Sequence, residues 1–260
     1  MDHPKGWAGN PRPDTLPKMI VAEDRGELLL VTQPDHARFA AQLLALWRRR
    51  ELRQHPRREL LIAAVREHDN GWRETDAAPR IDRSTGHPYD FRKLPAGPRR
   101  ELWRRGVERF SGTTPYTALL AAKHSYELHR DRRADPGWAA FLDQLAERLE
   151  ELLAAAQLDA AELHADYRWL ELADALSLAV CCRSTAPVVR DGLTARLSDG
   201  ELEIEPFPLA GATTFEIPCR RIADRRYQGE ADLARGLGSA RWKHLEVRCR
   251  PSPTGRQTRG

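Results

Sequence analysis

Alternating apolar and polar positions near the N-terminus predict a pair of short strands. The runs KMIVAED (residues 18–24) and ELLLVTQ (residues 27–33) are separated only by Arg25 and Gly26. Two short apolar runs joined through a two-residue connection that contains glycine are typical of a β-hairpin. We therefore expect the chain to open with a hairpin.

Helical periodicity then covers the middle of the chain. Phe39 and Leu43 recur at helical spacing between residues 35 and 50, and Pro56 precedes a second helix at about residues 57–68. Further helices are predicted at about residues 99–110, 116–130, 138–157 and 160–182.

Short alternating runs return after residue 184, where Asp199 and Gly200 form a turn signal between two of them. We therefore predict a mostly α-helical bundle with an N-terminal β-hairpin and a small C-terminal antiparallel β element. The predicted parts are a disordered leader at residues 1–17, a helical core with its hairpin at 18–183, a β-rich element packed on that core at 184–250, and a disordered tail at 251–260.

Composition narrows the class of protein. No segment of the 260 residues approaches the ~20 apolar residues of a membrane span, and the polar N-terminus lacks the apolar region of a secretory signal. We therefore expect a cytoplasmic protein without a membrane partner. The net charge is +4, but the basic residues are interleaved with acidic ones, as in RRRELRQHPRREL (residues 48–60), which is typical of a solvated helix surface. Nucleic acid is therefore not an expected partner.

Four ionisable residues lie on the apolar faces of four predicted helices. His36 begins the apolar stripe of the first helix, and His68 ends that of the second. His124 and Asp174 fall within the stripes of two later helices. A buried polar group without a partner costs about 1 to 3 kcal/mol, and a buried unpaired charge costs more.

Two interpretations account for these four residues. Each can be satisfied separately, as a hydrogen-bonded core histidine, a backbone-bonded aspartate or a polar helix end. Alternatively, all of them meet at one cation, and four coincidences on successive helices favour this shared site. Imidazole and carboxylate ligands suit divalent Mn, Fe, Co, Ni, Zn or Mg.

The same residues carry a resemblance to a known superfamily. An early histidine in QPDHARFA, the doublet in REHDNGW and a late aspartate in LADALSLAV resemble the HD superfamily of metal-dependent phosphohydrolases, which are all-helical proteins. More narrowly, the motifs QPDHARFAAQLLALW, HDNGW, DRSTGHPYDF, YTALLAAKHSYEL and LADALSL resemble a bacterial family known only as domain of unknown function 3891. The wider resemblance implies an HD-like core with a set of metal ligands: His36, His68, Asp69, His124 and Asp174.

The sequence departs from many HD enzymes immediately after the doublet. Asn70, Gly71 and Trp72 follow it, where a Gly-Lys pair is common, so no lysine is available there for phosphate. We expect Gly71 to end the helix with a positive φ. The long segment at residues 70–98, rich in Gly, Pro, Asp and Asn, is expected to pack over a pocket as a lid.

If the site is catalytic, Asp69 would orient the attacking water or bridge two ions, and Lys123 would hold substrate phosphate. Further substrate contacts are expected from four residues of the long segment: Trp72, Arg80, Tyr89 and Arg92. The expected function is a metal-dependent hydrolase of a small phosphorylated compound, either a nucleotide or another phosphoester. The alternative is a non-catalytic binding or sensor protein that keeps the core as a scaffold. A homo-oligomer is a further expectation, and the β element is expected to serve either in packing or in oligomerisation.

Overall fold

The computed structural model describes residues 19–76 and 80–253. The predicted leader and the part of the predicted tail from residue 254 onward lie outside the described residues. The strands are β1 (Ile20–Asp24), β2 (Glu27–Val31), β3 (Val188–Arg190), β4 (Leu193–Ser198), β5 (Glu201–Glu205), β6 (Thr213–Ala223) and β7 (Lys243–Pro251).

Helices connect these strands. The α-helices are α1 (Gln33–Ala45), α2 (Arg50–Arg53), α3 (Arg58–Glu67), α4 (Arg73–Asp76), α5 (Ala96–Ser111), α6 (Pro115–His129), α7 (Pro136–Ala156), α8 (Ala160–Cys181) and α9 (Glu230–Ser239). Short 3-10 helices are η1 (Asn70–Trp72), η2 (Phe91–Lys93) and η3 (Arg130–Arg132).

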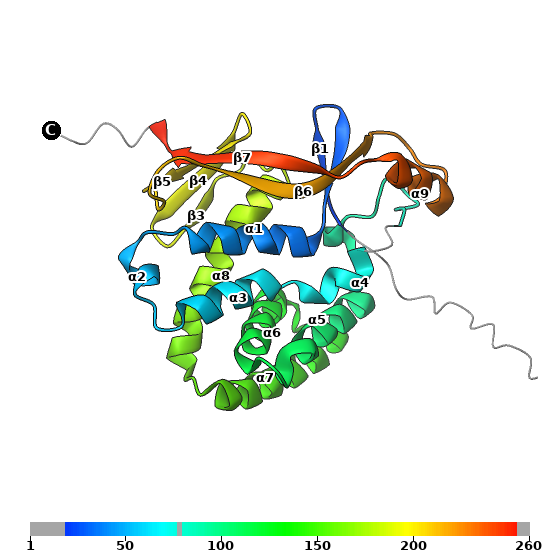
Figure 1. The fold of residues 1–260 in the computed structure, drawn as a ribbon. Coiled ribbons are helices and arrows are strands. Elements are labelled where there is room, and N and C mark those ends of the chain that lie inside the picture. The colour runs from blue at the N-terminus through cyan, green and yellow to red at the C-terminus, as the bar shows by residue number, and fades with distance from the viewer. Residues whose placement is uncertain (1–18, 77–79, 254–260) are drawn as a thin grey trace, which may run out of the picture.

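The strands form one curled sheet above the helices (Figure 1). It has seven strands in the order β1-β2-β6-β7-β5-β4-β3. Neighbouring strands are antiparallel except β5 and β7, which are parallel, so the sheet is mixed. Strands from both ends of the described chain therefore share one sheet.

The prediction of a mostly α-helical bundle with a small C-terminal antiparallel element is wrong. About 53% of the described residues are helical, and the N-terminal hairpin continues the C-terminal strands because β2 pairs with β6. In that pair Leu28 lies opposite Ile222. Alternation of apolar residues marks where a strand lies, but it carries no information about a pairing partner almost two hundred residues away.

Helix α1 lies between the sheet and helices α3, α5, α6 and α7 (Figure 1). Its upper side packs on β6, where the rings of Phe39 and Phe215 meet edge to face with centroids 5.4 Å apart. Leu43 and Leu44 are fully buried. At its start, the side chain of Thr32 accepts a hydrogen bond of 3.1 Å from the backbone N–H of Asp35. This cap fixes the first turn of α1 in the interior of the molecule.

Helix α8 runs through the helical layer towards the sheet (Figure 1). It begins with a capping box in which Asp159 and Glu162 each accept the other's backbone N–H. Leu170 and Val180 are fully buried, so the middle of α8 belongs to the core. Within the described part of the chain, no helix combines the length and the apolar character needed to cross a bilayer.

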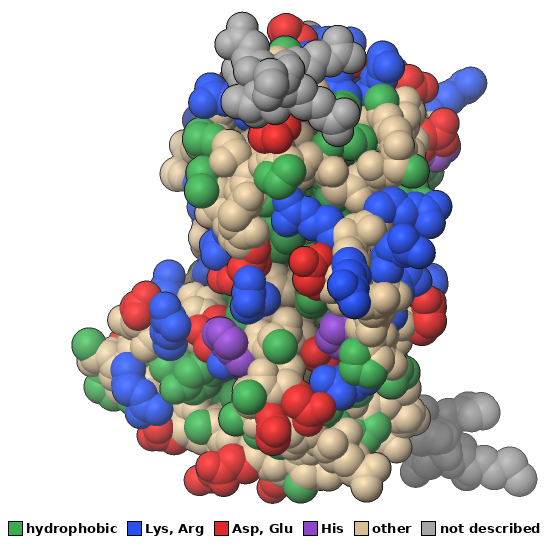
Figure 2. All heavy atoms as spheres, turned by 90° about the vertical axis from the view of Figure 1, so that its left-hand side faces the viewer, with side chains coloured by type: hydrophobic (Ala, Val, Ile, Leu, Met, Phe, Trp, Pro, Cys, Tyr) green, Lys and Arg blue, Asp and Glu red, His purple; other side chains and the backbone are tan. Residues whose placement is uncertain are grey.

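Charged side chains of both signs cover the outside. On the face drawn in Figure 2, Lys and Arg side chains are interspersed with Asp and Glu side chains. Ion pairs such as Arg133 with Asp143, 2.7 Å apart, link neighbouring segments at the surface. The interleaving of charge along the sequence thus extends to the folded surface on this face.

Candidate metal centre

The His-Asp doublet lies where α3 ends. His68 is the C-terminal cap of α3, and Asp69 leads into η1. Gly71 does not have the expected positive φ. Instead, the backbone of α5 approaches so closely that a Cβ on residue 71 would lie 2.4 Å from the carbonyl oxygen of Leu102. The glycine is therefore needed for tight packing of α5 against the doublet.

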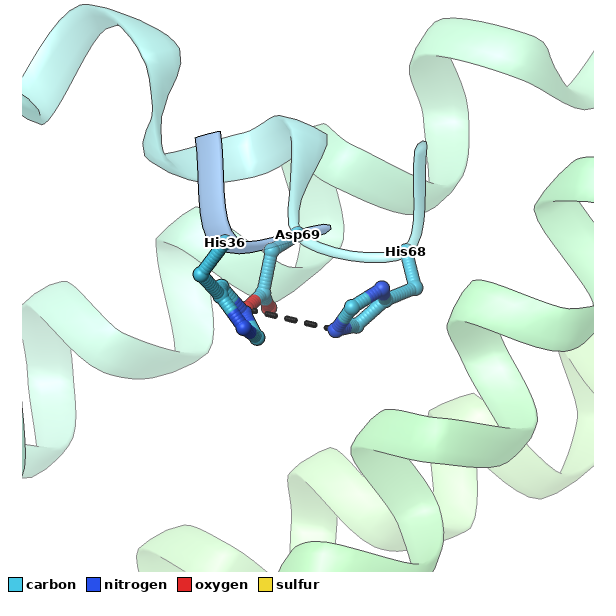
Figure 3. Close-up of side chains that lie close together, drawn as sticks. All are labelled: His36, His68 and Asp69. Atoms are coloured by element: carbon cyan, nitrogen blue, oxygen red, sulfur yellow. Dashed lines mark hydrogen bonds and ion pairs between the residues drawn. The ribbon is translucent and has the colours of Figure 1, made fainter. Parts of the chain in front are cut away.

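Side chains from α1, α6 and α8 converge on this doublet. His36 Nε2 lies 2.8 Å from Asp69 Oδ2, and Figure 3 shows the His36 ring beside the Asp69 carboxylate, with the His68 ring directed towards them. Asp174 reaches the same point from α8, with Oδ1 3.3 Å from His68 Nε2. His124 Nε2 lies 3.9 Å from Asp174 Oδ2. All five side chains are buried.

In His36 and His68, the ring nitrogen that points away from the centre is Nδ1, and it donates a hydrogen bond to the protein. His68 Nδ1 lies 2.7 Å from the carbonyl oxygen of Val65, which can only accept, so Nδ1 carries a proton. His36 Nδ1 lies 2.7 Å from Ser177 Oγ, and this hydroxyl donates its own proton to the carbonyl of Asp174 at 3.0 Å. The hydroxyl must therefore accept from His36.

This assignment leaves the inward nitrogens without protons when the rings are neutral. Lone pairs on Nε2 of His36 and His68 then face the carboxylate oxygens of Asp69 and Asp174, which is repulsive. His68 Nε2 is buried and makes no hydrogen bond of acceptable geometry to any described residue. Positive charge at the centre, either a proton or a metal ion, removes the repulsion.

The pKa values of these side chains reflect the balance between burial and the charges of their neighbours. Burial alone would lower the pKa of His68, but the charges of Asp69 and Asp174 outweigh it and raise this pKa to about 9. Burial would raise the pKa of both carboxyl groups, yet the neighbouring imidazoles hold both below the ordinary value. For His124, burial dominates and lowers the pKa to about 4. The carboxylates are therefore charged and His124 is a neutral ligand at neutral pH.

The donor set fits a divalent metal ion. The donors form two groups of three residues, and within each group the ligand atoms lie within 4.8 Å of one another. One group is His36, His68 and Asp69, and the other is His68, His124 and Asp174. They share His68, so all five residues surround one region. Each imidazole whose Nδ1 bonds to the protein is oriented by that contact, as is usual for metal-binding histidines.

A cavity of about 220 Å³ opens from this centre. Asp69, His124 and Asp174 form part of its wall. Of the residues predicted to contact substrate, Trp72 and Arg92 line it as well. Trp72 is buried and packs edge to face against Phe91 of η2. Part of the long segment therefore covers the cavity.

The other predicted substrate contacts lie elsewhere. Lys123 Nζ pairs with Glu127 at 2.5 Å, and Lys123 is not among the residues that line the cavity. Arg80 and Tyr89 do not line it either, and the Tyr89 hydroxyl donates to the carbonyl of Lys93 at 3.3 Å. The structure thus brings the five expected ligands together. Of the five other residues expected at the site, only Trp72 and Arg92 line the cavity.

Sequence reasoning missed several residues of the cavity wall, namely Gln33, Arg99, Trp103 and His129. Arg99 and Trp103 are four residues apart on α5, so they share a helix face. His129 continues the buried side of α6 beyond His124. Of these residues, His129 could have been identified from the sequence, because it lies on the same buried side of its helix as His124.

Comparison with known proteins gives a family without an assigned activity. The model of a family described as "Protein of unknown function (DUF3891)" matches residues 19–224. The chain belongs to this family. Neither the curated proteins nor the solved structures yielded a match. Family membership therefore assigns no activity, and the chemistry has to be inferred from the residues of the site.

Proposed function

We propose that the protein is a metal-dependent hydrolase of a small phosphorylated compound. The observation that carries the proposal is the orientation of His36 and His68, whose Nδ1 atoms are held by protein acceptors while Nε2 faces two carboxylates. A divalent cation among Mn, Fe, Co, Ni, Zn and Mg satisfies this arrangement. The order of the ligands along the chain, an early His, a His-Asp doublet, a further His and a late Asp, also resembles the HD superfamily of phosphohydrolases.

A bound divalent cation supplies Lewis acidity and lowers the pKa of coordinated water towards about 7. Asp69 belongs both to the ligand set and to the cavity wall, so its carboxylate can orient an attacking water. The water oxygen would form a bond to phosphorus as the ester P–O bond breaks. The proton that the water gives up would pass to solvent, and the departing oxygen would take up one proton, so that the products are an alcohol and inorganic phosphate. Trp72 and Phe91 exclude bulk water from this side of the cavity.

Elemental analysis of the purified full chain, followed by a phosphatase screen with added Mn or Co, tests the proposal. We expect stoichiometric metal and turnover of at least one phosphoester. Asp69→Ala should lose both, with helicity by circular dichroism largely retained. His244→Ala is the control, because His244 is exposed on β7, and it should behave as the wild type.

Two outcomes contradict the proposal in different ways. Full metal content in Asp69→Ala would show that the doublet is not part of the metal site. Stoichiometric metal without turnover of any phosphoester would instead support a non-catalytic binding or sensor protein.

A further inference from the structure

The cavity beside the metal centre has walls of opposite charge. Asp69 and Asp174 contribute carboxylates, and Arg92 and Arg99 contribute guanidinium groups. Along one wall, Trp103 contacts the ring of His124, with centroids 5.6 Å apart, and also that of His129, 6.0 Å away. A continuous wall therefore leads from the metal ligands to a second, basic group of residues.

The charge of Arg99 is not balanced by a carboxylate. Within the described part of the chain it forms no ion pair, and its side-chain hydrogen bonds run from Nη2 to the carbonyl oxygens of Phe91 at 3.3 Å and Arg92 at 3.0 Å. Its Nε is buried and has no hydrogen-bond partner there. Burial, together with the charge of Arg132, lowers the pKa of Arg99. An anion in the cavity would balance this charge and would accept from the part of the guanidinium group that lines the cavity.

Arg92 provides the contrast within the same cavity. Its guanidinium group binds Asp90 through Nε at 2.6 Å and through Nη2 at 3.1 Å. This carboxylate already satisfies Arg92 and raises its pKa. Of the two arginines on the wall, only Arg99 has charge and donors to offer a ligand.

His129 shapes the space beside Arg99 without adding charge. Its ring stacks on Trp138 at 4.3 Å, and Nδ1 donates to the carbonyl of Ser125 at 2.7 Å. Burial lowers the pKa of His129 to about 4, so the ring is neutral at neutral pH. With Nδ1 protonated, Nε2 is an acceptor and suits a hydroxyl group of a ligand.

We propose that Arg99 binds the anionic group of the substrate, and that this group is a phosphate held between the metal centre and the guanidinium. This inference rests on the proposed function for the location of the chemistry. Nη1 of Arg99 makes no hydrogen bond within the described part of the chain, so this atom can donate to a phosphate oxygen. A ligand with a terminal phosphate thus meets positive charge at both ends of the cavity.

Calorimetric titration of the full chain with inorganic phosphate tests this role, using metal-loaded and metal-stripped protein. Arg99→Met should weaken phosphate binding by about tenfold or more, because a charge-assisted hydrogen bond is lost. Arg99→Gln keeps an amide donor for the carbonyls of η2 but removes the charge, and it should show the same loss. Arg100→Met is the matched control, because Arg100 is the next residue on α5 and lies over Trp138, outside the cavity wall. Its affinity should equal that of the wild type.

The results separate this inference from the proposed function. Phosphate binding that depends on Arg99 in a protein without stoichiometric metal would support the anion site and overturn the hydrolase. Wild-type phosphate affinity in a folded Arg99→Gln variant with full metal content would overturn the anion site alone. Titration with acetate distinguishes the anions, and equal or tighter binding of acetate would overturn the assignment to phosphate.

Discussion

Ser177 shows how one hydroxyl can set the tautomer of a buried imidazole. It accepts from His36 Nδ1 and donates to the backbone carbonyl of Asp174, so it connects two of the candidate metal ligands, one on α1 and one on α8. The hydroxyl is fully buried, and water cannot replace it without a rearrangement. Both the tautomer and the direction of His36 therefore depend on a residue that does not reach the metal centre.

Replacement of this hydroxyl should weaken the metal site without destroying it. In Ser177→Ala we expect metal affinity, measured by competition with a chelator, to fall by about tenfold. This is the lower end of the effect usual when the hydrogen-bond partner of a metal-binding histidine is lost. Ser125→Ala is the control, since Ser125 is also fully buried but its hydroxyl has no hydrogen-bond partner among the described residues. Unchanged affinity in Ser177→Ala would show that the hydroxyl does not orient His36.

At the scale of elements, Asp24 ties the end of β1 to two distant segments. Its carboxylate pairs with Arg221 of β6 and, at 3.1 Å, with Arg183, which follows α8. Burial would raise the pKa of Asp24, but the hydrogen bond from Arg221 and the two arginine charges outweigh it and lower the pKa. These ion pairs therefore link the N-terminal hairpin both to the C-terminal strands and to the end of the helical layer.

Asp24→Asn should therefore destabilise the fold by roughly 1 to 3 kcal/mol, because two partly buried guanidinium groups lose their counter-charge. Since the pKa of Asp24 is lowered in the folded state, its contribution is present above the ordinary value of 3.8 and is lost as the pH falls below it. Denaturant unfolding should show a large difference from wild type at pH 7 and a smaller one near pH 3. Asp131→Asn is the control, because Asp131 is almost fully exposed. A difference that stays constant with pH would contradict the ion-pair explanation.

Local patterns predicted the helices more closely than the sheet. The predicted helix at residues 160–182 corresponds to Ala160–Cys181, because apolar periodicity and the Asp159 cap are local signals. The five expected ligands could be found for the same reason, since each lies on or beside an apolar stripe. The pairing of β2 with β6 depends on contacts between distant segments, which no local pattern records. Arg99 was missed because it differs from the other arginine of the cavity in having no carboxylate partner among the described residues. This difference can be seen only in the folded structure.

At the scale of the whole molecule, α1 connects the sheet with the helical layer, which were predicted from the sequence as separate parts. One side of α1 packs on β6 and the other on α3 and α8, and it carries His36 into the metal centre. The sheet therefore supports a candidate metal ligand, although no described strand contributes a residue to the two candidate groups. Removing the C-terminal strands should disturb the centre as well as the sheet.

Deletion of residues 184–260 tests whether the helical part folds by itself. The deletion would uncover the side of α1 that carries Phe39 and leave β2 without its partner β6. Exposed apolar surface and an unpaired strand edge both favour loss of cooperative folding and aggregation. We expect the shortened chain to unfold without a cooperative transition, to bind an apolar dye and to lose stoichiometric metal. A shortened chain that unfolds cooperatively near the wild-type temperature and keeps its metal would show instead that the helical core at residues 18–183 is an independent domain.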